Sequence, residues 1–427
     1  MDTSLLNEPP APTTGRHAGP VADGASGLLF SAGFALTPPL AVLAPLGIAP
    51  LAILMAVAGV VFRWRTAGRL FWSPAPVVTL IVASIVWGSL TLVWTISPRE
   101  SWHLLPSFVV DMLGGLILAQ LAAQLSDAEK RRVVQGLAGG LVVGMILLII
   151  EGMTRGAIQG WLRAAEGQPH FVFEETYLNR AIACTAILSW PIAIVVQRRW
   201  GPKAGVALMA FVLLALSGFT SDKSVLSIAT GGVVFGLSYV WPRRAARVVG
   251  AAVALSIMVA PSVARIPAYF VPPMKQAELP PSIGHRILIW DFVSHRIAER
   301  PLLGWGLNSS RVIPGGKDTP RPGTENLPLH PHSAPLQWWL ELGGIGAGLL
   351  ALLIGVTVAL IGRHFPERGE QAFALGMTTC IWTIAAVGYG IWQGWWVSAL
   401  CIFFSALAVV APHPTVATGL HSSRRAA

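Results

Sequence analysis

Long apolar runs recur along the whole 427-residue chain, and they constrain its fold more than any other feature. A helix needs about 20 mostly apolar residues to cross a bilayer. Hydrophobic residues make up 54% of the chain and charged residues only 12%, against about 25% charged in soluble proteins. A transmembrane β-barrel would instead show short segments of alternating hydrophobicity. The sequence therefore predicts an all-α polytopic membrane protein with no separate soluble domain.

About twelve transmembrane helices are expected, nine before a long hydrophilic segment and three after it. Residues 1–26 are predicted to be a disordered tail, 27–261 to hold helices 1–9, 262–333 to form a loop, 334–411 to hold helices 10–12, and 412–427 to be a C-terminal tail. The expected spans are about 27–43, 45–62, 76–95, 103–124, 132–151, 177–197, 203–219, 224–241, 245–261, 334–361, 370–388 and 391–411.

Basic residues gather in alternate connections between these spans. More than half of the 30 Lys and Arg lie in the two tails and in the loops after spans two, four, six, eight and ten. Cytoplasmic loops of membrane proteins are enriched in these residues, so both termini are predicted to be cytoplasmic. Segments 152–176 and 262–333 would then face outward. The same rule accounts for the net charge of +10 without a nucleic-acid partner.

Residues 285–299, within the second outer segment, are predicted to form a helix that lies on the membrane surface or caps the bundle. An apolar stripe at helical spacing supports this: Ile289, Trp290, Val293 and Ile297. Pro301 would end the helix. Arg286 would open it, where a cation does not favour the helix dipole but can join backbone N–H groups in holding an anion. A solvated arginine at the membrane interface is the alternative interpretation.

Two more cations, Arg180 and Lys223, are expected near the outer ends of their spans. Both side chains are long enough to extend to the interface without any further role. Together with Arg286, however, they predict a site for an anionic head group, because ionisable groups at membrane depth are functional candidates by default. Asp111 and Glu151 are the remaining ionisable candidates, and their roles stay open.

Two histidines, His330 and His332, precede the span that begins at residue 334. Such a pair can bind a metal when the backbone is extended, which Pro331 between them favours. No carboxylate cluster completes a metal site nearby, so no metal is expected. A structural role at the helix start is a second interpretation. The favoured third is a general base, since neutral imidazole titrates near working pH and can accept a hydroxyl proton.

The stretch HRILIW…AERPLLGWGLNSSR, followed by HPHSAPLQWWLELGGIGAGLL, resembles the C-terminal signature of the O-antigen ligase and O-antigen polymerase superfamily. That signature runs from R-x-x-hydrophobic-W through a P-x-x-G-x-G turn to H-x-H-N and a helix with E-x-G-x-x-G. Its positions fall here at Arg286, Trp290, Pro301, Gly304, Gly306, His330, His332, Glu341, Gly343 and Gly346. The resemblance is strong from His285 to Leu350 and weaker upstream.

The resemblance implies a cofactor-free, metal-independent glycosyltransferase of the bacterial inner membrane, with a periplasmic active site. Members take a glycan from undecaprenyl pyrophosphate; ligases transfer it to lipid A–core, and polymerases to another lipid-linked repeat. Arg286, Arg180 and Lys223 would hold the pyrophosphate. His332 would activate the acceptor hydroxyl, with His330 orienting it or binding sugar. Attack from the face opposite the leaving group would invert the anomeric carbon.

Two positions depart from the family pattern. Ser333 stands where Asn is usual, and Lys223 stands where an arginine is expected. Lysine keeps the charge but loses the two-pronged hydrogen bonding of a guanidinium. An O-antigen or exopolysaccharide polymerase of the same superfamily is one alternative function. A secondary transporter is another; twelve spans permit it, whereas the long outer loop and the sparse mid-membrane charge argue against it.

Overall fold

The computed structural model describes residues 23–67, 75–168, 170, 172–219, 221–271, 278–320 and 323–412. Within these ranges the regular elements are helices and no β-strand occurs. The predicted all-α class is therefore confirmed. Most of the expected N-terminal tail and nearly all of the C-terminal one lie outside the described residues. The first helix begins at Asp23, slightly earlier than predicted.

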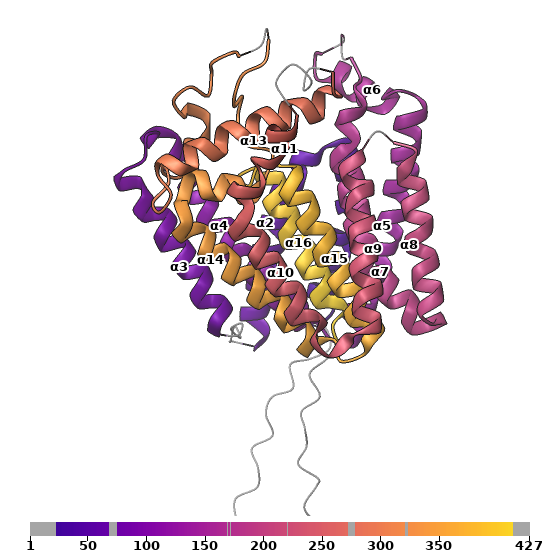
Figure 1. The fold of residues 1–427 in the computed structure, drawn as a ribbon. Helices are drawn as coiled ribbons and strands as arrows, with labels where there is room; N and C mark the ends of the chain where they lie inside the picture. Colours follow the sequence, from indigo (N-terminus) through magenta and orange to yellow (C-terminus); the bar gives the residue numbers. More distant parts are fainter. Residues whose placement is uncertain are drawn as a thin grey trace, which may run out of the picture.

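Each of the twelve predicted spans coincides with a helix in the structure (Figure 1). These are α1 (Asp23–Leu43), α2 (Ile48–Ala67), α3 (Ala75–Leu90), α4 (Pro98–Ala123), α5 (Asp127–Met153), α7 (Asn179–Trp200), α8 (Pro202–Ser217), α9 (Asp222–Val240), α10 (Pro242–Val263), α14 (Ala334–His364), α15 (Arg368–Val387) and α16 (Gly394–Val410). Among the described residues, nine helical segments are long and apolar enough to cross a membrane. Helices α8 and α16 are apolar but shorter, and α15 begins with a polar turn.

Proline and polar caps set several of the helix starts. Pro98, Pro202 and Pro242 occupy the first turns of α4, α8 and α10, where a missing backbone N–H costs nothing. Ser126 and Glu129 form a reciprocal capping box at the start of α5. These local signals fix the short connections between neighbouring antiparallel helices.

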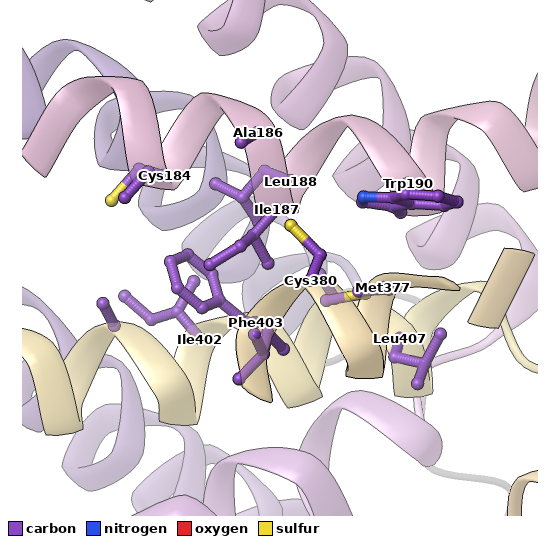
Figure 2. Packing of buried hydrophobic residues seen from close by; sticks show 14 of the residues in the cluster. Cys184, Ala186, Ile187, Leu188, Trp190, Met377, Cys380, Ile402, Phe403 and Leu407 are labelled. Carbon is purple, nitrogen blue, oxygen red and sulfur yellow. The ribbon is translucent and has the colours of Figure 1, made fainter. Parts of the chain in front are cut away.

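Helix α7 is the most enclosed of the nine segments. Figure 2 shows its side chains, including Ile187 and Trp190, facing Met377 and Cys380 of α15 and Phe403 of α16. The last two helices therefore pack against the middle of the chain. This packing brings both ends of α15 and α16 close to the ends of α7.

The helix ends that carry the basic connections gather on one side of the bundle. Lys130, at the start of α5, donates to the carbonyl of Ala411 after α16 at 3.2 Å. Arg198, near the end of α7, forms an ion pair with Glu370 in the first turn of α15 and donates to the carbonyl of Val410 at 2.7 Å. The alternation of charge seen in the sequence thus corresponds to a distinct basic side.

The opposite side carries two short helices, α6 (Ala157–Ala165) and α11 (Ile266–Phe270), and the longer α13 (Pro281–Glu299), which lies across the helix ends (Figure 1). The predicted apolar stripe of α13 is confirmed, since Ile289, Val293 and Ile297 are buried. The predicted start is wrong, because a proline at position 281 begins the helix one turn earlier. Arg286 therefore lies beyond the first turn and not at the free N–H groups.

The segment after α13 inserts into a kink of α14. Gly343, inside α14, has φ +65°, a conformation that side-chain-bearing residues rarely adopt. The kink exposes backbone groups that the preceding turn binds: Trp305 N–H donates to the Leu340 carbonyl at 2.9 Å, and Gly344 N–H to the Pro301 carbonyl at 2.7 Å. The P-x-x-G-x-G turn at residues 301–306 and helix α14 therefore pack together as one unit.

Candidate active site

The two predicted histidines lie side by side just before α14, with ring centroids 4.4 Å apart. The backbone at His332 is not extended, as shared metal binding by the pair would require, but has φ +53°. Histidine is one of the few side-chain-bearing residues enriched in this left-handed region, and such geometry often marks functional sites. Trp290 of α13 holds the segment by donating to the carbonyl of Pro331 at 2.9 Å.

The hydrogen bonds of His332 define which ring nitrogen carries the proton. Its Nδ1 lies 3.2 Å from the carbonyl oxygen of Gly388, which can only accept, so Nδ1 must donate. In the neutral ring Nε2 then keeps its lone pair, and no described residue forms a hydrogen bond with it. Nε2 of His330 forms a hydrogen bond of 2.9 Å with the side-chain amide of Gln393. Both bonds come from the short turn 388–393 between α15 and α16.

Both imidazoles favour the neutral form. Burial, the neighbouring His332 and the charge of Arg311 lower the pKa of His330 to about 3. Burial also lowers the pKa of His332; the hydrogen bond that its Nδ1 donates to the carbonyl of Gly388 opposes this effect, and the charges of Arg286 and Lys223 reinforce it. At neutral pH each ring is therefore uncharged, which is the state that a general base requires.

The structure brings the three predicted cations to this region. Lys223 lies within electrostatic range of both Arg180 and Arg286, and Arg286 and Lys223 both act on His332. Arg180 lies 5.4 Å from the ring centroid of Trp395, and Lys223 lies 4.3 Å from that of Tyr389. These two rings contact each other edge to face at 4.7 Å. The turn between α15 and α16 and the start of α16 thus form an aromatic platform for both cations.

None of these three cationic head groups forms an ion pair with a described carboxylate. Arg286 is half-buried, and burial lowers its pKa while the charge of Asp222 raises it. Collected, partly buried cations without carboxylate partners repel one another, so an anion between them would be stabilised. The chemistry of the cluster fits a phosphate or pyrophosphate, the group that guanidinium and ammonium ions bind well.

A cavity of about 440 Å³ opens beside His330. Arg180 lines it together with Arg311, which the sequence reasoning missed. Arg311 was missed because it lies in the irregular segment η4 (Ser309–Val312) and has no periodic pattern around it. Of the predicted site residues, Arg180 and His330 therefore face this cavity, whereas Lys223 and Arg286 act on His332.

Glu341, part of the family signature, connects the whole site and is fully buried. Its carboxylate accepts hydrogen bonds from the Asn308 backbone at 2.6 Å, from Gln337 at 2.9 Å, and from the Ser310 hydroxyl and the Trp392 indole. Gln337 in turn accepts from the backbone of Ile391 at 2.9 Å. Glu341 therefore joins α14, η4 and the turn that holds both histidines.

The two other ionisable candidates lie apart from this constellation. Glu151 is buried at the end of α5, where its carboxylate accepts from the backbone of Ile158 at 2.8 Å and so caps the start of α6. Asp111 lies within α4, and its carbonyl contacts the thiol of Cys401. Among the described residues, no group of three or more His, Cys, Asp or Glu side chains is placed to hold a metal ion.

Known proteins share the part of the chain that carries this site. Residues 204–351 match the family model described as O-antigen ligase. A Rickettsia conorii protein with the provisional name polysaccharide ligase is 29% identical over 268 residues, which cover 61% of this chain and 62% of that protein. A Rickettsia felis protein with the same provisional name is 28% identical over 274 residues, which cover 61% of this chain and 63% of that protein. A Rickettsia bellii protein, also of that name, is 26% identical over 296 residues, which cover 66% of this chain and 69% of that protein.

The chain spans less than two thirds of the length of the first two of these relatives. The matched family segment contains Lys223, Arg286 and both histidines. The resemblance inferred from the motifs is thereby confirmed: residues 204–351 of this multi-pass membrane protein match the O-antigen ligase family model, and the relatives carry names consistent with that superfamily.

Proposed function

We propose that this chain is a metal-independent glycosyltransferase that moves a glycan from undecaprenyl pyrophosphate to a hydroxyl of lipid A–core. The family and the relatives support a polysaccharide ligase- or polymerase-type role. Two observations at His332 support the finer proposal: its Nδ1 donates to the carbonyl of Gly388, which leaves the lone pair on Nε2, and it lies within electrostatic range of Arg286 and Lys223. A base next to an anion site is what transfer from a pyrophosphate donor needs.

The reaction breaks one bond and forms one bond. The acceptor oxygen attacks the anomeric carbon of the donor sugar, and the bond from that carbon to the pyrophosphate oxygen breaks. The hydroxyl proton passes to Nε2 of His332, and the leaving group departs as undecaprenyl pyrophosphate. Arg286 and Lys223 stabilise the negative charge that develops on the leaving oxygen, whereas Arg180 lines the cavity beside His330. Attack opposite the leaving group inverts the anomeric carbon.

Glycan profiles of cells that lack the chain test this proposal. If the chain is a ligase, cells that lack it should carry lipid A without any polymer, while polymer accumulates on the lipid carrier. A profile in which single repeats still reach lipid A would contradict the ligase proposal and indicate an O-antigen polymerase. Loss of a secreted polysaccharide alone would indicate an exopolysaccharide polymerase.

The proposed location is the inner membrane, with both termini in the cytoplasm and the site in the periplasm. Cysteine labelling of intact cells checks this orientation, and the native cysteines are all buried. An impermeant maleimide should label Ala164→Cys, which is exposed on α6, but not His364→Cys, which is exposed on the basic side. Labelling of His364→Cys and protection of Ala164→Cys would reverse the orientation. Permeabilised cells should label both variants and so provide the control.

A further inference from the structure

The cavity beside His330 has features that the pyrophosphate site does not use. Its volume of about 440 Å³ lies within the range of small-molecule pockets. Arg180 and Arg311 both line it, and neither guanidinium forms a hydrogen bond or ion pair with a described residue. Two unpaired guanidinium groups in one cavity carry a charge of about +2, which matches a phosphate group at neutral pH.

The rest of the lining suits a sugar ring. Trp392 and Trp395 border the cavity, and both indole N–H groups are already engaged, one with Glu341 and the other with Gln393 Oε1 at 3.0 Å. Their remaining exposed surface is therefore apolar. Asn308 also borders the cavity; its amide nitrogen donates to the carbonyl of Glu100 at 3.2 Å, which leaves its carbonyl oxygen to accept from a ligand hydroxyl. Ligand pockets are usually lined by apolar and aromatic surface together with a small number of well-positioned polar groups.

The cavity is lined by His330, but His332, Lys223 and Arg286 are not among its lining residues. The charge of Arg311 acts on His330, whereas those of Lys223 and Arg286 act on His332. The ring centroids of the two histidines are 4.4 Å apart. A ligand in the cavity would therefore contact His330 and lie close to His332, the proposed base, without occupying the place of Lys223 and Arg286.

From this arrangement we propose that the cavity binds a phosphorylated saccharide acceptor, with Arg311 and Arg180 contacting its phosphate. The role of this saccharide as an acceptor rests on the proposed glycosyl transfer. Its binding to the cavity does not require turnover and can be measured separately. Arg311 is a specificity-determining residue in this account. It selects among acceptors by charge and takes no part in the bond-making step.

Calorimetric binding to the detergent-solubilised full chain tests the cavity directly. The probes are the phosphorylated core oligosaccharide released from lipopolysaccharide, the same oligosaccharide after enzymatic dephosphorylation, and undecaprenyl pyrophosphate. Arg311→Gln should weaken binding of the phosphorylated oligosaccharide about tenfold, a modest loss because Arg311 is solvent-exposed. Binding of the dephosphorylated probe and of undecaprenyl pyrophosphate should not change. Arg311→Lys should recover part of the loss, since it keeps the charge.

Arg163→Gln is the matched control, because Arg163 is an exposed arginine of α6 outside the site. Unchanged affinity of Arg311→Gln for the phosphorylated probe, or equal losses for both oligosaccharides, would overturn the proposal. Weaker binding of undecaprenyl pyrophosphate alone would assign Arg311 to the donor instead and would equally overturn it. A wild-type chain that binds the phosphorylated oligosaccharide but never transfers glycan would refute the proposed function while leaving the cavity site intact.

Discussion

Replacement of His332 by alanine is expected to lower the rate of glycan transfer about 10²–10⁴-fold, the usual contribution of a general base. The variant keeps Lys223 and Arg286, so it should still bind the lipid-linked donor with nearly normal affinity. Single-turnover transfer and donor binding, measured on the same solubilised protein, separate these two quantities. Near-normal transfer would leave His332 with only a structural role. Equal losses of binding and transfer would place it in the anion site.

Two further alanine variants provide controls for this result. His295→Ala removes an exposed histidine of α13 and should leave transfer unchanged. His330→Ala should cost less than His332→Ala, because His330 contacts the backbone N–H of His332 at 3.2 Å and so positions the base without being it. A larger loss in His330→Ala would exchange the two roles.

The pH dependence of transfer provides an independent test of the same residue. Burial lowers the pKa of His332 below the usual value of 6.5. The ring therefore stays neutral as pH falls through 6.5, and wild-type transfer should decline only at lower pH, as Nε2 takes up a proton and loses its lone pair. The residual transfer of His332→Ala should lack this decline. A wild-type midpoint at or above pH 6.5 would contradict the lowered pKa.

Arg286→Ala is expected to weaken donor binding about ten- to a hundredfold, the effect of losing one hydrogen-bonded charge contact. Arg286 lies half-buried beside Lys223 and His332, where solvent screens the lost contact less than it would at the surface. Binding of undecaprenyl pyrophosphate to the solubilised variant measures the change. Arg286→Lys should retain much of the affinity because it keeps the charge.

The matched control for this variant lies on the same helix. Arg296→Ala removes an arginine that pairs with Glu299 at 2.8 Å and has no contact with the histidine pair. It should bind donor normally. Full donor affinity in a well-expressed Arg286→Ala protein would remove Arg286 from the pyrophosphate site.

The helices and part of the site could be predicted because their signals are local. Apolar runs mark each of the twelve long helices, and the stripe through Ile289, Val293 and Ile297 gives the buried face of α13. The sequence predicted a start of α13 at residue 285, whereas the helix begins at Pro281. A one-turn error is small for the fold, yet it changes what surrounds Arg286.

The remaining site residues depend on contacts between segments far apart in the sequence. Gly388 and Gln393 hold the histidines from the turn after α15, and no local pattern links that turn to His330 and His332. Glu341 belongs to the family motif, but its partner Trp392 follows only from the packing of α14 beside the end of α15. Such contacts are set by tertiary structure, whereas sequence periodicity reports only which face of a helix is buried.

The most direct test of the central claim is a transfer assay with purified chain, glycan-labelled undecaprenyl pyrophosphate donor and lipid A–core acceptor, in the presence of EDTA. The account predicts that the label moves to the acceptor through a new glycosidic bond of inverted configuration. One molecule of undecaprenyl pyrophosphate should be released for each bond formed. Label that stays on the lipid carrier, or that crosses the membrane of reconstituted vesicles without a new bond, would contradict it and favour a transporter.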